Sequence, residues 1–200
     1  MVGKDPRYLQ ADARIRAAFL DLFRDKDIED ITTSEIIRAA GVNRSTFYAH
    51  YADKYALLDA VEQEFLDRLE TLLPDSPAIA IMQGRECDRA ALESYFRRFL
   101  DFLHQNEDLL AGLVSRSENS FMVQFSNTFA RVLREHGAAE NLQIPVEYGA
   151  SLLAWSTAGL VEEWARGGFT DDRENVLRIL VDVAAHIQGL VFGQPPASAD

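Results

Sequence analysis

Apolar residues recur along nearly the whole chain at the three- and four-residue spacing of an amphipathic α-helix. Near the N-terminus, Ile15, Ala18, Phe19 and Phe23 form one stripe on a helix expected over roughly 9–26. No segment shows the alternation of polar and apolar residues, with Gly-rich two-residue turns, that is typical of a hairpin sheet. The sequence therefore predicts an all-α protein with about nine helices.

Two short helices follow, over roughly 34–40 and 44–51. Thr32 and Glu35 have the spacing of a capping box, which satisfies free amides at a helix N-terminus. Gly41 suits the positive φ of a tight turn. The connection between the two helices is too short for an antiparallel pair and favours helices that cross steeply. This pattern predicts a helix-turn-helix.

The polar side chains of the third helix differ from those of a solvated surface helix. Ile36, Ile37, Val42 and Phe47 are expected to pack against the first helix. The remaining positions then point elsewhere, and they are Arg44, Ser45, Thr46, Tyr48 and His50. Nearly all of these side chains form hydrogen bonds and none is acidic, which is the composition that a recognition helix needs in a DNA major groove.

The charge is distributed unevenly. The chain has 200 residues and a formal net charge of −12, which excludes a protein that coats nucleic acid nonspecifically. Residues 1–54 carry nine basic and nine acidic residues, whereas residues 55–200 carry 11 and 23. Because residues 36–52 contain no acid, Arg38, Arg44 and Lys54 form a local positive surface. We therefore expect two domains with different tasks.

The first domain is predicted over 1–54 and the second, an antiparallel helical bundle, over 55–193. A helix over 53–73 connects them, and 74–87 is expected to be a linker, although a weakly amphipathic stretch there stays open. A flexible tail is expected over 194–200. Later helices are predicted from Asp88, over 109–114, over 121–133 with an end at Gly137, from Pro145 to about Arg166, and from Asp172 to Phe192.

Several classes of protein are disfavoured. The single cysteine, Cys87, excludes an internal disulfide framework and fits a reducing cytosol. No signal peptide and no uncharged apolar run of about 18 residues is found, so we expect a cytoplasmic protein without a membrane span. Motifs typical of serine hydrolases, nucleotide-binding loops and zinc proteases are missing, so we expect no enzyme, cofactor or metal. Two minor alternatives stay open, a Cys87 nucleophile with His104 as base and a metal site at His104, Glu107 and Asp108.

Over residues 10–62 the chain resembles the tetracycline-repressor (TetR) family of bacterial one-component regulators. The residues that match the family pattern in register are Thr33, Ile36-Ile37, Ala40-Gly41-Val42, Ser45-Thr46-Phe47-Tyr48, His50-Tyr51, Lys54 and Leu57-Leu58. The resemblance implies that Thr33, Tyr48 and Lys54 bind DNA phosphates. It also implies that Arg44, Ser45, Thr46 and His50 lie near base edges. Many relatives carry Gly or a large aromatic residue at the positions of Ser45 or Ala49, so the operator sequence does not transfer.

The second domain contains two aromatic-rich helices, which pack a core or line an apolar ligand cavity. The candidate ligand-binding residues are Phe96, Phe99, Leu103, Met122, Phe125, Phe129 and Trp155. Four arginines of this domain could either bind an acidic ligand or form surface ion pairs, namely Arg97, Arg98, Arg116 and Arg131. We favour the surface ion pairs. For a dimer interface we predict the helices over 146–166 and 172–192. The residues expected there are Leu152, Leu160, Val161, Trp164, Leu177, Leu180, Val181, Ala184 and Ile187.

Together these features predict a homodimeric regulator of transcription, a repressor that binds a pseudo-palindromic double-stranded DNA operator. A small apolar or aromatic effector is expected to release it. The alternative from another class is a helical ligand-binding or protein-interaction module without DNA binding. Salt dependence separates the two, since each neutralised phosphate contributes about −0.9 to the log–log slope of DNA affinity against salt.

Overall fold

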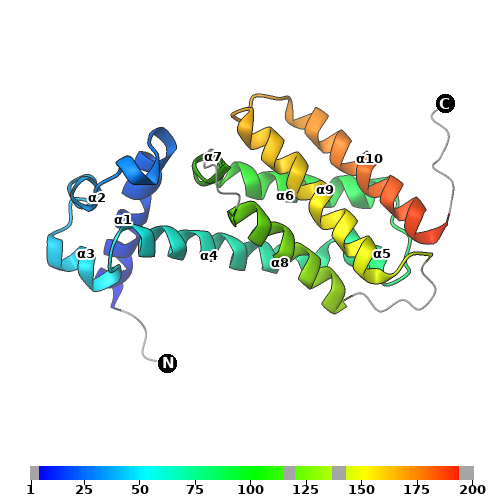
Figure 1. Cartoon of the computed structure of the whole chain (residues 1–200), viewed down its shortest axis with the longest axis horizontal. Coiled ribbons are helices and arrows are strands. Elements are labelled where there is room, and N and C mark those ends of the chain that lie inside the picture. The colour runs from blue at the N-terminus through cyan, green and yellow to red at the C-terminus, as the bar shows by residue number, and fades with distance from the viewer. Residues whose placement is uncertain (1–4, 115–119, 137–142, 194–200) are drawn as a thin grey trace. The chain divides into compact units, whose positions relative to one another are not determined.

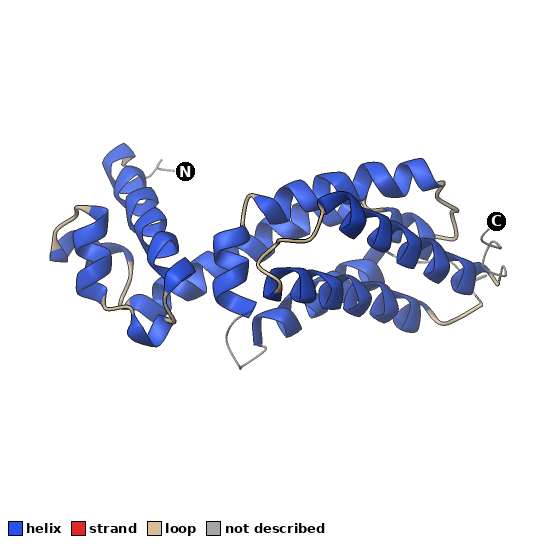
Figure 2. Ribbon diagram, turned by 90° about the horizontal axis from the view of Figure 1, so that it is seen from above, coloured by secondary structure: helices blue, strands red, loops and turns tan. Residues whose placement is uncertain are grey.

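The computed structural model describes residues 5–114, 120–136 and 143–193. Within these ranges the chain forms ten α-helices and two short 3₁₀ helices. Figure 2 shows helices joined by loops, with no strand among the described residues. The predicted all-α class is confirmed. The prediction of about nine helices is one short, because a helix forms inside the segment expected to be a linker.

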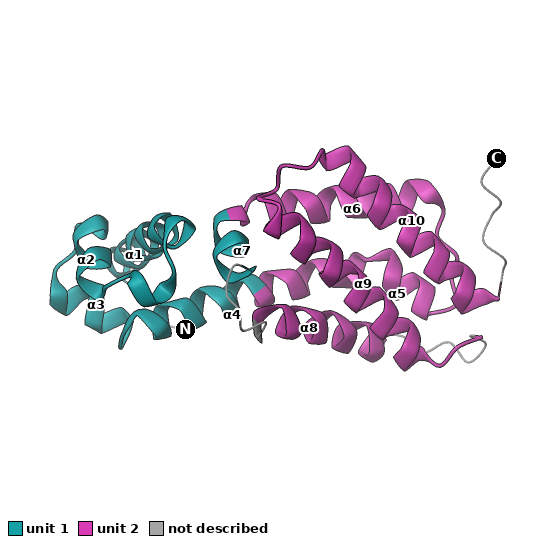
Figure 3. Ribbon diagram, turned by 45° about the horizontal axis from the view of Figure 1, so that its top comes forward, with its two compact units in different colours: residues 1–65, 108–117 teal, residues 66–107, 118–200 magenta. Residues whose placement is uncertain are grey.

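The chain divides into two compact units, coloured teal and magenta in Figure 3. Unit 1 contains Met1–Phe65 and Asp108–Ser117, and unit 2 contains Leu66–Glu107 and Glu118–Asp200. The units therefore divide within the helix expected to connect the domains, further along the chain than the predicted boundary at 54. Unit 1 also gains a segment from the middle of the sequence, which no local pattern indicated.

Unit 1 is built around a helix-turn-helix. Its elements are α1 (Pro6–Asp25), η1 (Ile28–Asp30), α2 (Thr33–Ala40), α3 (Arg44–His50), the first part of α4 (Lys54–Leu72) and α7 (Glu107–Val114) (Figure 1). α1 packs on both α2 and α3. The predicted capping box is present: the Glu35 amide donates to Thr32 Oγ1, and the Thr32 amide donates to a Glu35 carboxylate oxygen. Each of the helices α1 to α4 contributes a fully buried side chain to unit 1, namely Phe19, Ile36, Phe47 and Leu57.

α7 completes unit 1 by packing closely on α1. A Cβ atom added at Gly112 would lie 2.4 Å from the Phe23 ring and 3.0 Å from the Phe23 carbonyl oxygen. Only a residue without a side chain allows this approach, so glycine at this position permits the contact. Phe23 is fully buried as a result.

Unit 2 is a helical bundle. Besides the end of α4 it contains η2 (Leu73–Asp75), α5 (Pro77–Met82), α6 (Arg89–His104), α8 (Ser120–His136), α9 (Val146–Arg166) and α10 (Arg173–Phe192). α8 packs on α9, and α10 packs on both α6 and α9. By length and composition α10 could span a bilayer, with a mean hydropathy of 1.4. Its apolar stripe, which includes Leu177, Leu180 and Val181, is instead buried in the bundle.

The predicted linker over 74–87 is wrong. Pro77 begins α5, where its missing amide costs nothing, and the Ser76 side chain accepts a hydrogen bond from the Ile79 amide. Ile79, Ile81 and Met82 are buried in unit 2. The amphipathic alternative is the correct one: the prolines mark helix starts here and do not mark a flexible connection.

Several predicted helix ends are confirmed. Asp88 and Asp172 accept hydrogen bonds from first-turn amides of α6 and α10, and Pro145 immediately precedes α9. Gly137 and the tail over 194–200 lie outside the described residues.

Candidate nucleic-acid interface

The start of α3 is held by its N-cap residue, Asn43. The Asn43 Oδ1 atom accepts hydrogen bonds from the Thr46 amide and the Ser45 hydroxyl, both at 2.7 Å. Arg44 and Ser45 are exposed on the first turn, and Thr46 is half-buried beside them. The cap therefore fixes the backbone that presents three of the predicted base-contacting side chains.

The turn before α3 is fastened to α1. Gly41 has φ +60° and ψ 37°, a left-handed conformation that favours glycine. Its carbonyl oxygen accepts a hydrogen bond of 2.8 Å from Arg14 Nη2. Arg14 was not singled out from the sequence, because nothing in its helix indicates a contact 27 residues away. It is a positioning residue for the recognition helix.

The exposed surface of α2 and α3 is polar and carries no acid beyond the first turn of α2. Tyr48 is 49% exposed, and its ring meets the edge of the buried Phe47 ring. Thr33 occupies the first turn of α2, where backbone amides lack partners within the helix and the helix dipole favours an anion. Together with Arg38 and Arg44, these residues form the candidate interface.

His50 does not lie with the other predicted contact residues. Its side chain is 2% exposed and its ring stacks on Tyr8 with a centroid distance of 3.7 Å. Its Nδ1 atom lies 3.4 Å from Asp12 Oδ1 and makes no hydrogen bond. His50 follows the buried Phe47 by three residues, which places it on the same face of α3, toward α1. The structure thus corrects its expected position near base edges.

Lys54 also differs from its expected role. Its ammonium group donates to the carbonyl oxygens of Ile28, Glu29 and Ile31 at 2.7, 3.1 and 2.9 Å. An ammonium group has three donors, so all of them are used inside unit 1. The resemblance assigned this lysine to a DNA phosphate, whereas the structure shows it closing the loop between α1 and α2.

A partly buried polar network joins α1 to the end of α3 and to α4. The Tyr51 hydroxyl donates to Asp12 Oδ1 at 2.5 Å, and Arg16 Nε donates to Asp12 Oδ2 at 2.9 Å. Arg16 Nη1 also donates to Glu64 Oε2 at 2.7 Å. Burial raises the pKa of Asp12, but the Tyr51 hydrogen bond and the Arg16 charge outweigh it, so the pKa lies below its ordinary value. The carboxylate stays charged and holds the three elements together.

The predicted ligand-binding residues of unit 2 lie in two environments. Most are buried in the core, where the Phe99 and Phe125 ring centroids are 6.5 Å apart; they are Phe96, Phe99, Leu103, Met122, Phe125 and Phe129. Trp155 is 50% exposed and does not join them. The helical spacing located the aromatic faces correctly, but these faces pack against one another.

All but one of the residues predicted for a dimer interface are covered within a single chain. Leu160 is half-buried, and the other covered residues are buried, namely Val161, Trp164, Leu177, Leu180, Val181, Ala184 and Ile187. The exception is Leu152, which is exposed on α9. The other large apolar side chains that these helices expose, Tyr148 and Trp155 on α9 and Leu190 on α10, were not predicted for the interface.

The alternatives that would make an enzyme or a metal site gain no support. Cys87 is half-buried, and burial raises the pKa of its thiol, which lowers the reactive thiolate fraction. His104 Nδ1 lies 2.5 Å from a Glu107 carboxylate oxygen at the end of α6. In the part of the chain that the structure describes, no three His, Cys, Asp or Glu residues are grouped to hold a metal ion.

The helix-turn-helix segment matches known regulators. The family described as "Bacterial regulatory proteins, tetR family" matches residues 15–61. The chain is 35% identical over 66 residues to the uncharacterized HTH-type transcriptional regulator YxbF of Bacillus subtilis, covering 33% of this chain and 17% of that protein. It is 34% identical over 91 residues to the tetracycline repressor protein class C of Escherichia coli, covering 44% and 41%. The matched parts thus span less than half the length of these curated relatives.

Solved structures share the fold over almost the entire chain. A TetR transcriptional regulator from Streptococcus agalactiae has a TM-score of 0.60 at 24% identity, covering 90% of this chain and 97% of that one. NalD, described as the secondary repressor of a multidrug efflux pump in Pseudomonas aeruginosa, has a TM-score of 0.64 at 17% identity, covering 92% and 98%. Together with the two curated relatives, the family match identifies residues 15–61 as a helix-turn-helix segment of the tetracycline-repressor (TetR) family, and the solved structures show that the chain shares the fold of regulators of that family.

Proposed function

We propose that the protein is a repressor that binds a pseudo-palindromic double-stranded DNA operator as a homodimer and is released by a small-molecule effector. The observation that carries this proposal is the surface of α3. Its first turn presents Arg44 and Ser45 to solvent, its backbone is capped by Asn43, and residues 36–52 contain no acid. We place this activity in the cytoplasm, where operator DNA is accessible.

We assign the direct readout of bases to Arg44, with Ser45 and Thr46 beside it. A guanidinium pairs bidentately with guanine O6 and N7, which is worth about 1–3 kcal/mol of discrimination. Thr33 and Tyr48 are proposed to bind phosphates and fix the register. Lys54 and His50 are proposed to position the recognition helix from inside unit 1. The Lys54 ammonium group donates to backbone carbonyl oxygens there, and the His50 ring stacks on Tyr8.

We propose that a second copy of the chain covers the exposed face of α9 and α10. Tyr148, Leu152 and Trp155 follow one another at spacings of four and three residues, so they form a single stripe on α9. Leu190 is exposed on the neighbouring α10. In a dimer with two-fold symmetry, the stripe of one chain packs against the same stripe of its partner. The α9 and α10 helices of the two chains then form a four-helix contact. Two recognition helices related in this way require a pseudo-palindromic operator.

Effector response is proposed to pass through α7. This helix packs on α1 within unit 1, while the chain segments on both sides of it belong to unit 2. A ligand that changes unit 2 can therefore bias the element that supports α1. Coupling of this kind is typically worth about 1–3 kcal/mol in operator affinity.

Selection of bound fragments from random DNA at near-physiological salt tests the proposal. We expect a pseudo-palindrome to be enriched, with affinity that falls steeply as salt rises. Arg44→Ala should reduce the preference for the selected site over nonspecific duplex, whereas Arg134→Ala, which removes the same charge from α8, should not. Failure to enrich any sequence would favour the alternative, a helical ligand-binding or protein-interaction module.

A further inference from the structure

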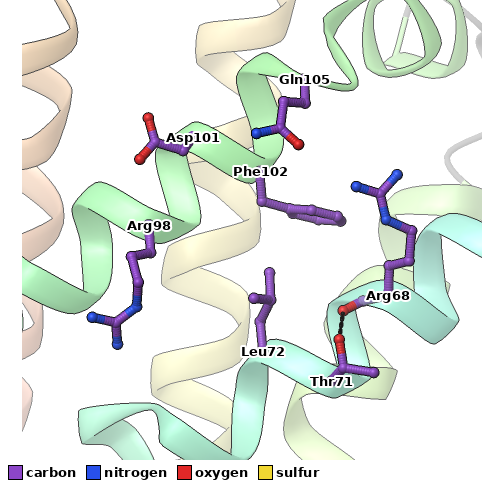
Figure 4. Close-up of a pocket in the computed structure, with 7 residues that line it drawn as sticks. All are labelled: Arg68, Thr71, Leu72, Arg98, Asp101, Phe102 and Gln105. Atoms are coloured by element: carbon purple, nitrogen blue, oxygen red, sulfur yellow. Dashed lines mark hydrogen bonds between the residues drawn. The ribbon is translucent and has the colours of Figure 1, made fainter.

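Two pockets in unit 2 lie along one face of α6 and share Arg98. The first has a volume of about 340 Å³ and lies between α6 and the end of α4, where Arg68, Leu72 and Phe102 line it (Figure 4). The second has a volume of about 430 Å³ and lies between α6 and the η2–α5 segment; Arg85 and Tyr95 line it. We call this pair of pockets the α6 groove. Each volume falls in the range typical of small-molecule sites.

The arginines of the α6 groove lack acidic partners. In unit 2 the described arginines that form ion pairs are Arg89, Arg97, Arg131, Arg166, Arg173 and Arg178. No described carboxylate lies within 4.0 Å of Arg68, Arg85, Arg98 or Arg134, and the first three of these line the groove. In a chain with 32 acidic and 20 basic residues, carboxylates are plentiful. Arginines gathered without them in one groove indicate a site for an external anion.

The acidic residues of the groove do not cancel this charge. Asp101 lines the first pocket, and its carboxylate accepts a hydrogen bond from Arg173, which lines neither pocket. The lining of the second pocket contains one carboxylate, that of Asp75, and two guanidinium groups, those of Arg85 and Arg98. Each pocket therefore has two guanidinium groups and one carboxylate. The net charge of the lining is positive, although unit 2 as a whole is strongly acidic.

The groove also offers apolar surface. In the view of Figure 4, Leu72 and Phe102 lie between Arg68 and Arg98. The Arg68 guanidinium lies 5.3 Å from the centre of the Phe102 ring. Arg98 donates to the Ser94 hydroxyl at 3.1 Å, which leaves most of its donors available. Tyr95 in the wall of the second pocket is 4% exposed.

We propose that the α6 groove binds a small organic carboxylate, with the carboxylate on Arg98 and a compact apolar or aromatic body against Leu72 and Phe102. A planar guanidinium with free donors pairs bidentately with a carboxylate, which gives both affinity and orientation. The site differs from the interior cavity predicted from Phe96, Phe99 and Phe125, which the core fills. That the bound carboxylate acts as the effector rests on the proposed function, whereas its binding does not.

Calorimetric titration of the full chain, without DNA, tests the binding. The probes are 4-phenylbutyrate and octanoate, each compared with the alcohol of the same carbon skeleton. We expect each carboxylate to bind at least about tenfold more tightly than its alcohol. Arg98→Gln should remove this preference, and Arg68→Gln should weaken it. Arg134→Gln, the matched unpaired arginine outside the groove, should leave it unchanged.

Three results would overturn the proposal: equal affinities for carboxylate and alcohol, an equal loss from Arg98→Gln and Arg134→Gln, or no carboxylate binding at about 1 mM. Arg98→Lys guards against a loss caused by misfolding. It keeps the charge without the bidentate geometry, so it should bind more weakly than wild type and more tightly than Arg98→Gln. Operator release is measured separately: binding without release contradicts the effector role, and release without groove binding contradicts the site.

Discussion

At the scale of single residues, the left-handed turn at Gly41 combines two constraints that can be separated by mutation. A Cβ atom at Gly41 would lie 2.5 Å from Arg14 Nη2, whereas Gly168, also left-handed at φ +65°, has no atom within 4 Å. Both Gly→Ala variants should pay about 1–2 kcal/mol for the backbone conformation. Only Gly41→Ala should also break the Arg14 hydrogen bond and weaken DNA binding. Urea unfolding and operator titration measure the two effects, and equal DNA binding by both variants would contradict the role given to Arg14.

Lys54 distinguishes an internal clamp from a phosphate contact. Lys54→Ala leaves the carbonyl oxygens of Ile28, Glu29 and Ile31 without their charged donor. We expect it to lower the free energy of unfolding by about 1.5–3 kcal/mol, as for hydrogen bonds to charged groups. Lys26→Ala removes the same charge from an exposed ion pair with Glu35 and should cost about 0–1 kcal/mol. If Lys54→Ala keeps full stability and only reduces the salt slope of DNA binding, the phosphate role inferred from the resemblance is correct.

The capping box of α2 predicts a pH dependence of stability. Hydrogen bonds from Lys26 and from the Thr32 amide and hydroxyl lower the pKa of Glu35 from 4.5 to about 2. A pKa lowered on folding stabilises the native state above the unfolded value and loses this effect as pH falls through the folded value. Glu35→Gln should therefore be less stable than wild type at pH 7, and the difference should shrink between pH 4.5 and about 2. Chemical unfolding over this range measures it, and a difference that is independent of pH would contradict the assignment.

At the scale of helices, local sequence predicted the ends better than the contacts. Thr32, Asp88 and Asp172 marked helix starts correctly, because capping acts within one turn of the chain. The faces of the last two helices were assigned less well. Periodicity indicates an apolar stripe on α9, but Trp164 is covered within the chain and Trp155 is not, and only the neighbouring helices decide this. His50 and Lys54 were misplaced for the same reason, since their partners Tyr8 and Ile28 are distant in sequence.

A substitution at Gly112 tests the packing of α7 on α1. In Gly112→Ala the new methyl group would meet both the Phe23 ring and its carbonyl oxygen, and a backbone atom cannot move aside easily. Overpacking of this kind costs about 1–3 kcal/mol. We expect the variant to bind operator in the absence of effector but to respond less to effector, because the α7–α1 contact is altered. An unchanged effector response, measured by operator titration with and without effector, would remove α7 from the proposed coupling.

At the scale of the whole molecule, the exposed stripe on α9 predicts the assembly state. Trp155→Lys places a charge in the proposed dimer contact and should yield a monomer near 22.5 kDa in sedimentation equilibrium at micromolar concentration. Val123→Lys, which changes an exposed apolar residue of α8, should remain a dimer. A monomeric wild type, or a dimeric Trp155→Lys variant, would contradict the proposed interface. The all-α class, the helix-turn-helix and the two helices proposed for the dimer contact could be predicted from the sequence. Most of the residues exposed on those helices could not, because burial within one chain must first be known.

Unit 1 is assembled from two separate segments of the chain, and this affects the order in which the protein folds during synthesis. α1 to α4 leave the ribosome first, but α7, which packs on Phe23, follows only after α5 and α6 have been made. Domains that are continuous in sequence can fold as soon as they emerge, N-terminal first. Here the nascent N-terminal unit keeps an uncovered aromatic surface on α1 until about residue 114 is translated. A fragment that ends at residue 65 retains that surface permanently, so an isolated DNA-binding unit made from this chain will be prone to associate through it.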